Sequence, residues 1–171
     1  MRWNHEGVAE DLGTFESDLD AIASKINDRG EIVGVSFPES VYDYGRAVIW
    51  RQKGFPIALA PCTAETCDSG ASAINNRGDI AGYVKGTVFV QIGESFKDIG
   101  GLSGSQFNPP NEMNDSGSVV GVSWPLGLSG PIRSWIWTAD AGLQELRLTS
   151  ATEIFVTGIN NKGEIIGYSR H

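Results

Sequence analysis

The stretch that decides the fold is "INNRGDIAGY", residues 74–83, which the chain repeats near its C-terminus as "INNKGEIIGY", residues 159–168. Two further segments share the form apolar-Asn-[Asn/Asp]-x-Gly-x-apolar-x-Gly, namely "INDRGEIVG" from Ile26 and "MNDSGSVVG" from Met113. Asn, Asp and Gly favour tight turns, and the flanking residues favour strands. Each copy therefore predicts a β-hairpin, and four copies predict a repeat protein.

Further strands are predicted between these hairpins. Runs of β-branched and aromatic residues lie at 45–50, 87–92 and 132–137, and each is followed by a turn and a second short run, at 55–60, 95–100 and 143–148. The hairpin motifs start 48, 39 and 46 residues apart, so each repeat holds about four short strands. No stretch of about ten residues has the 3.6-residue period of a helix, and we expect very little helix.

Four strands in each repeat predict an all-β fold, a small β-propeller with four blades of four antiparallel strands in a single domain, residues 1–171. The repeats span approximately 16–60, 69–100, 108–148, and 153–171 together with 1–15. A β-solenoid would need one rung about every 20 to 30 residues, and a β-sandwich would not need four copies of one turn. Both remain as alternatives at this stage.

The last repeat contains the first two strands of a blade but not the third and fourth. The N-terminal "MRW", "NHEG" and "VAEDLG" are similar to the end of a third strand, a turn and a fourth strand, with Trp3 in the position of Trp50 and Trp137. We therefore expect the N-terminal strands to pair with the C-terminal strands and close the ring, which leaves no open sheet edge. The alternative to this closed monomer is an eight-bladed dimer that exchanges these strands between two copies.

The repeat resembles the HAF family of probable extracellular repeats. The residues that carry the resemblance are "INDRGEIVG", "RAVIW" (46–50), "DLGTF" (11–15) and "DIGGLSG" (98–104), and it covers essentially the whole chain. Arg46 stands where the family's His-Ala-Phe triplet has its histidine. The resemblance implies a repeat architecture and a secreted, cell-envelope or periplasmic location, and it brings no catalytic residues.

Charge and hydropathy exclude several classes of partner. The chain has 13 Lys and Arg against 21 Asp and Glu, a formal net charge of −8, so nucleic acid and anionic membrane surfaces are not expected partners. The apolar runs are far shorter than the roughly 20 residues that span a bilayer, so no membrane insertion is expected. No basic-then-apolar run typical of a signal peptide follows Met1, which fits a mature form, a trimmed domain or a cytoplasmic protein.

The two cysteines, Cys62 and Cys67, lie in the turn-rich segment "PCTAETCDSG" (61–70). We expect a local disulfide between them, which suits an oxidising compartment, and two free thiols are the alternative. No further Cys or His pair lies nearby to complete four metal ligands, so neither a metal nor a cofactor is expected. The repeated Asn turns offer too few oxygen ligands for calcium, and we expect Asn to cap its own turn.

Catalysis is not expected. His5 and His171 are the only histidines, and the predicted strands separate them, so they cannot form a catalytic pair.

Candidate binding residues lie in four long loops, 36–45, 60–70, 100–112 and 123–132. The candidates are the aromatic and acidic residues of these loops: Glu39, Tyr42, Asp43, Tyr44, Phe107 and Trp124. Aromatic rings beside carboxylates can bind a peptide or a sugar, although loop aromatics also pack simply on the rim of a fold. The sequence therefore predicts a non-catalytic binding module that recognises a protein partner, with a carbohydrate-binding lectin, and so a glycan as partner, as the alternative.

Overall fold

The computed structural model describes residues 1–38, 44–51, 55–59 and 68–171. In these residues the chain forms β-strands and one 3-10 turn, Leu126–Leu128, so the prediction of an all-β fold is confirmed. No helix in the described ranges is long and apolar enough to cross a membrane.

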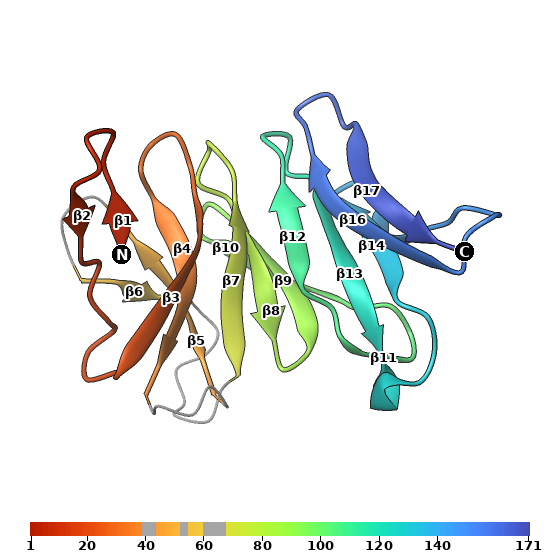
Figure 1. The fold of residues 1–171 in the computed structure, drawn as a ribbon, viewed down its shortest axis with the longest axis horizontal. Helices are drawn as coiled ribbons and strands as arrows, with labels where there is room; N and C mark the ends of the chain where they lie inside the picture. The colour runs from red at the N-terminus through yellow and green to blue at the C-terminus, as the bar shows by residue number, and fades with distance from the viewer. Residues whose placement is uncertain (39–43, 52–54, 60–67) are drawn as a thin grey trace.

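The strands form five separate sheets that follow one another in a row in chain order (Figure 1). The N-terminal hairpin consists of β1 (Arg2–Trp3) and β2 (Ala9–Glu10). Sheet I consists of β3 (Asp20–Ile26), β4 (Ile32–Phe37), β5 (Arg46–Trp50) and β6 (Ile57–Ala58). Sheet II consists of β7 (Ser69–Ile74), β8 (Ile80–Val84), β9 (Thr87–Ile92) and β10 (Ser95–Gly100).

Sheet III consists of β12 (Pro110–Met113), β13 (Val119–Pro125), β14 (Arg133–Thr138) and β15 (Gly142–Leu146), and β11 (Ser105–Phe107) pairs with the far end of β13. The C-terminal hairpin consists of β16 (Glu153–Ile159) and β17 (Ile165–Arg170). All these pairings are antiparallel. Each repeated Asn turn joins the first two strands of its sheet, as the sequence predicted.

The predicted closure of the ring within one chain is wrong. Among the described residues, β1 pairs only with β2 and β17 only with β16, and the two termini lie at opposite ends of the row (Figure 1). Paired strands must lie about 4.8 Å apart, and three full sheets lie between the terminal hairpins. A count of residues along the chain fixes which strands match in register, but it does not fix how strongly the row of sheets curves.

The apolar core lies between neighbouring sheets. Ile49 of sheet I and Phe89 of sheet II belong to one buried cluster, and Val90 of sheet II and Trp135 of sheet III belong to the next. Sheet faces that are buried against neighbours on both sides explain why the middle strands are apolar on both faces. On one side of the row, Lys25 Nζ on β3 lies 2.7 Å from Glu112 Oε2 on β12, an ion pair that spans the intervening sheet II.

The last glycine of each motif lies opposite a β-bulge in the first strand of its sheet. Gly34, Gly82, Gly121 and Gly167 pair with Ala23, Ala71, Pro110 and Val156, and in every case the register shifts immediately after that partner. A Cβ at these glycines would lie 2.0–2.5 Å from a backbone carbonyl oxygen of the bulged strand. The motif therefore keeps glycine at this position because the neighbouring backbone approaches too closely for a side chain.

The first Asn of each motif caps its own turn, as predicted. In all four turns its Oδ1 accepts hydrogen bonds from the backbone N–H groups two and four residues later, at 2.9–3.1 Å. The four residues concerned are Asn27, Asn75, Asn114 and Asn160.

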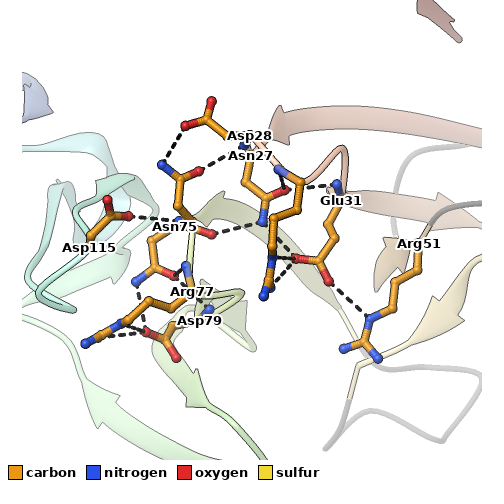
Figure 2. A network of polar contacts seen from close by, with 10 residues as sticks. Asn27, Asp28, Glu31, Arg51, Asn75, Arg77, Asp79 and Asp115 are labelled. Atoms are coloured by element: carbon orange, nitrogen blue, oxygen red, sulfur yellow. Dashed lines mark hydrogen bonds and ion pairs between the residues drawn. The ribbon is translucent and has the colours of Figure 1, made fainter.

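The same four asparagines also link the sheets, and Figure 2 shows the first part of this network. The Nδ2 of Asn27 donates to the carbonyl of Asn75 at 3.0 Å, that of Asn75 to Asn114 at 3.0 Å, and that of Asn114 to Asn160 at 2.9 Å. The residues that follow these asparagines form a second series of hydrogen bonds. The backbone N–H of Asp28 donates to Asn76 Oδ1, that of Asn76 to Asp115 Oδ1, and that of Asp115 to Asn161 Oδ1. We call these two series the Asn ladder.

Two carboxylates around the ladder predict sensitivity to acid. Burial alone would raise the pKa of Glu31, but hydrogen bonds from Asn27 and Arg29 and the charges of Arg29 and Arg51 outweigh it and lower this pKa below its usual 4.5. The pKa of Asp115 is lowered below its usual 3.8, chiefly by the hydrogen bond from the backbone N–H of Asn76. A carboxylate whose pKa is lower in the folded state than in the unfolded state stabilises the fold at pH values above the unfolded-state pKa. This stabilisation is lost as the pH falls through the folded-state pKa.

We therefore expect the free energy of unfolding to fall as the pH is lowered from neutrality past about 4.5 and further towards the folded-state pKa values of these two groups. Urea unfolding at a series of pH values measures it. The double variant Glu31→Gln, Asp115→Asn should show a shallower loss over the same range. Glu94→Gln is the control, because Glu94 is exposed and has no side-chain hydrogen bond or ion pair in the described structure. Equal pH dependence in the double variant and in the wild type would contradict the assignment.

Candidate functional site

The structure brings together two of the six predicted binding residues. Phe107 on β11 and Trp124 on β13 are direct partners in the β11–β13 ladder. Tyr44 is exposed, precedes β5 and does not line the same depression. The other predicted binding residues, Glu39, Tyr42 and Asp43, and the predicted disulfide of Cys62 and Cys67, lie outside the described residues.

Phe107 and Trp124 line an open depression of about 510 Å³ between sheets II and III. It lies at the end of the sheets opposite the Asn turns, where the longer loops are. The residues that line it are Asp68, Lys85, Gly86, Gln106, Phe107, Trp124 and Pro125. Its volume is in the range of sites that hold a small ligand or a side chain of a partner.

The tight turn between β8 and β9 forms one wall. Lys85 and Gly86 both have positive φ, 49° and 82°, so this is a two-residue hairpin turn. A Cβ at Gly86 would lie 2.5 Å from the carbonyl oxygen of Gln106, so the turn packs directly on β11. The backbone N–H of Lys85 also donates to the carbonyl of Asp68 at 2.8 Å, which fixes the start of β7 beside the turn.

Buried Asn108 holds this wall against sheet III. Its Nδ2 donates to the carbonyl of Gly86 at 3.0 Å, and its Oδ1 accepts from the backbone N–H of Leu102 and from the hydroxyl of Ser123. One amide thus joins the β8–β9 turn, the loop before β11 and strand β13. The positions of Phe107 and Trp124 relative to Lys85 are therefore set by the fold rather than by an isolated loop.

Tyr83 supports the aromatic side of the depression from behind. Its ring lies edge-on to that of Phe107, with the centroids 4.8 Å apart. Burial, together with the charge of Asp68, raises the pKa of Tyr83 to about 12. Its hydroxyl therefore stays protonated over the physiological range and is not a base.

Asp68 is the acidic group of the depression. Burial raises the pKa of its carboxyl above the usual 3.8. In the part of the chain that the structure describes, this carboxylate forms no ion pair or side-chain hydrogen bond. A half-buried carboxylate that has no partner within the described residues, next to Phe107 and exposed Trp124, can accept a basic or hydrogen-bonding group from a ligand while the rings contact the ligand's apolar part.

A second depression, of about 310 Å³, lies between sheet III and the C-terminal hairpin. Leu146 and Leu148 line it, together with charged groups that already pair with each other: Glu145 lies 3.0 Å from Arg147 and 3.8 Å from Arg133. None of the described residues that line it is aromatic. The two depressions are therefore chemically different, and the exposed tryptophan is not repeated.

Sequence reasoning missed Asp68, Lys85 and Gln106. The Lys85-Gly86 dipeptide between two strand-forming runs is a recognisable hairpin turn, so this wall could have been located. The proximity of Asp68 and Gln106 depends on the pairing of β11 with β13, which the sequence pattern does not indicate. The residues that the structure describes contain no group of three or more His, Cys, Asp or Glu able to hold a metal ion.

Comparison of the chain with models of protein families finds no matching family, and searches of curated proteins and of solved structures find no match. The resemblance to the HAF repeats therefore stays a prediction that these comparisons do not test.

Proposed function

We propose that the protein is a non-catalytic binding module, built as an open row of β-propeller blades, that recognises a protein partner through the depression of Phe107 and Trp124. The observation that carries the proposal is the pairing of exposed Trp124 with Phe107 beside the half-buried carboxylate of Asp68, which has no partner among the described residues. A secreted or cell-envelope setting, which the resemblance implies, is part of the same proposal.

The strand order supports the propeller. Sheets I and II each consist of four consecutive antiparallel strands, and β12–β15 of sheet III have the same order. Successive sheets pack face to face through apolar clusters. Four-stranded meanders that repeat in this way are typical of propeller blades. In such a fold the loops at one end of the sheets form a common binding face.

The chemistry of the depression favours a segment of a protein over a sugar. Among the described residues it combines aromatic surface with one carboxylate, that of Asp68, and one amine, that of Lys85 in the β8–β9 turn. A peptide with a basic side chain next to an apolar one matches the carboxylate and the aromatic surface. The net charge of −8 also favours a basic partner at long range. A multivalent lectin would carry similar aromatic sites between successive blades, and the second depression lacks an aromatic residue.

Selection from a phage-displayed peptide library tests the proposal. We expect enriched peptides that carry Arg or Lys next to an aromatic or aliphatic residue. Trp124→Ala should weaken the binding of a synthetic enriched peptide by about tenfold or more, since a central aromatic anchor usually accounts for that much. Asp68→Asn should weaken basic peptides more than analogues with the basic residue replaced. Titration calorimetry measures both effects.

Phe55→Ala is the matched control, because Phe55 is an exposed aromatic residue, 85% accessible, that does not line the depression. Its peptide affinity should equal that of the wild type. A screen on a glycan array completes the test. The proposal is overturned if no peptide is enriched, if Trp124→Ala binds the peptide normally, or if a glycan binds and Trp124→Ala abolishes that binding.

A further inference from the structure

The C-terminal end of the row exposes positions that are buried elsewhere. Ile166 is 68% exposed, although the residues at the same motif position, Val33, Ala81 and Val120, are all 0% exposed. In sheets I to III this position packs against the next sheet along the row. Ile166 is accessible because no sheet follows the C-terminal hairpin in this structure.

The N-terminal end exposes the complementary positions. Ile26 is 60% exposed, whereas Ile74 and Met113, which occupy its place in sheets II and III, are 5% and 4% exposed because the preceding sheet covers them. Trp3 is 66% exposed, against 3% for both Trp50 and Trp137. One end of the row therefore lacks a following sheet, and the other lacks the first half of a preceding one.

The N-terminal hairpin has the geometry of the second half of a blade. The backbone N–H of Gly13 donates to Asp11 Oδ1 at 3.0 Å just as that of Gly100 donates to Asp98 Oδ1 at 2.8 Å. Two residues before these matched aspartates lie Ala9 and Phe96. Ala9 pairs with Trp3 and Phe96 pairs with Gln91, so Trp3 occupies the position that Gln91 has in sheet II.

The position of Trp3 fixes what a missing strand would pair with. Gln91 lies opposite Ile80, just as Trp50 lies opposite Ile32 and Trp137 opposite Val119. Ile32, Ile80 and Val119 occupy the same position of the repeated motif, and the residue at this position in the C-terminal hairpin is Ile165. A blade made of β16 and β17 followed by β1 and β2 would thus place Ile165 opposite Trp3.

The two ends of the Asn ladder lack opposite halves of the same hydrogen bond between sheets. Among the described residues, Asn160 Nδ2 donates only to Glu164 of its own turn, whereas the other three amides donate to the next sheet. At the other end the carbonyl of Asn27 receives no hydrogen bond from another sheet among the described residues. The Asn160 amide can thus supply the hydrogen bond between sheets that the carbonyl of Asn27, which accepts only from Gly30 of its own turn among the described residues, lacks.

We propose that two copies of this chain join head to tail, with β17 of each copy pairing with β1 of the other, and so form a closed ring of eight blades. Each copy supplies three complete sheets and two halves. Ile165 pairs with Trp3 and Ile166 with Arg2, whose aliphatic part covers Ile166 while its guanidinium stays 2.6 Å from Glu10. The ladder continues from Asn160 to Asn27 of the second copy. A second copy is the occupant because within one chain the two ends face away from each other.

The second depression provides a site for Trp3 in this assembly. Leu12 and Phe15 pack against the cluster that contains Trp50, and Ile99 and Leu102 pack against the cluster that contains Trp137. The register of the last strand of each sheet makes Leu146 the equivalent of Leu12 and Ile99, because Glu145 lies opposite Trp135 just as Asp98 lies opposite Phe89. Leu146 and Leu148 line the second depression. Trp3 of the second copy would fill it.

Mass measurement by light scattering or native mass spectrometry tests the assembly. The wild type should have twice the monomer mass of 18.3 kDa at micromolar concentration. Ile166→Asp, at one end, and Trp3→Ala, at the other, should each weaken the dimer by about 30-fold or more, the loss expected for a central interface residue. Both side chains are exposed in the single chain, so neither change should alter the β-sheet circular dichroism of the monomer.

A mixing experiment distinguishes head-to-tail pairing from a symmetric contact. Ile166→Asp keeps an intact N-terminal end, and Trp3→Ala keeps an intact C-terminal end. Their mixture should form a heterodimer through one undamaged contact, although each variant alone is monomeric. A symmetric like-to-like contact would give no such rescue.

The register is tested by cross-linking in a Cys62→Ser, Cys67→Ser background. Trp3→Cys combined with Ile165→Cys should give an intermolecular disulfide on mild oxidation, because directly opposed residues have suitable spacing. Trp3→Cys combined with Ile166→Cys should not, because a shift of one residue puts the side chains on opposite faces. A wild type that stays monomeric at about 100 μM, or a dimer unaffected by Ile166→Asp and Trp3→Ala, overturns the proposal.

Discussion

Gly82→Ala should lower the free energy of unfolding by about 3 kcal/mol or more, which is at the upper end for a single added methyl group. The new Cβ would lie 2.2 Å from the carbonyl oxygen of Gly70 and 2.6 Å from the ring of Phe89, which is 1% exposed. Neither neighbour can move freely, because one is backbone at a bulge and the other belongs to the core between sheets I and II. Urea unfolding measures the loss.

Gly158→Ala is the matched control, since Gly158 also lies within a strand without positive φ, and the nearest atom to its added Cβ would be Ile166 Cγ1 at 3.5 Å. That change should cost less than about 1 kcal/mol. Equal losses in the two variants would show that the close approach at Gly82 is not what keeps glycine in the motif.

Asn75→Ala should lower the free energy of unfolding by about 3 kcal/mol, because it leaves several buried groups without partners. Asn75 is 3% exposed. Its Oδ1 accepts from the N–H groups of Arg77 and Asp79, and its Nδ2 donates to Asp79 Oδ2 at 2.9 Å and to the carbonyl of Asn114 at 3.0 Å. None of these is replaced by alanine.

Asn4→Ala separates the turn from the ladder. Asn4 Oδ1 accepts from the N–H groups of Glu6 and Val8 at 3.0 and 2.9 Å, the same spacing as in the Asn75 turn, but Asn4 is exposed and makes no hydrogen bond to another sheet in the described structure. Water can replace its hydrogen bonds, so the loss should stay below about 1 kcal/mol. If both variants lose the same amount, the hydrogen bonds between sheets do not contribute and only local turn capping remains.

The sequence predicted the individual sheets well because their determinants are local. Strands β9 and β10 match the predicted runs 87–92 and 95–100, and the repeated Asn turns are hairpins. The register of the N-terminal hairpin also places Trp3 in the position equivalent to Trp50 and Trp137, as the sequence predicted. Ring closure was wrong because it depends on the angle between packed sheets, which residue spacing does not contain.

The candidate site was predicted only in part for a related reason. Phe107 and Trp124 were identified as loop aromatics, and the structure shows that they are neighbours in a short ladder. Asp43 and Glu39, the predicted carboxylates, lie outside the described residues, and the carboxylate that the described part of the structure places beside the rings is Asp68. Asp68 reaches this position through the contact of the β8–β9 turn with β11, and such contacts between sheets leave no periodic trace in the sequence.

The second residues of the four turns alternate along the Asn ladder, as Asp28, Asn76, Asp115 and Asn161. Asn76 and Asn161 each return an Nδ2 hydrogen bond to the aspartate before them, at 2.8 Å. Loss of sheet II alone would therefore bring Asp28 against Asp115, two carboxylates with no amide between them. Loss of sheets II and III together would instead bring Asp28 against Asn161 and keep the alternation, so the ladder accommodates the removal of two neighbouring sheets better than the removal of sheet II alone.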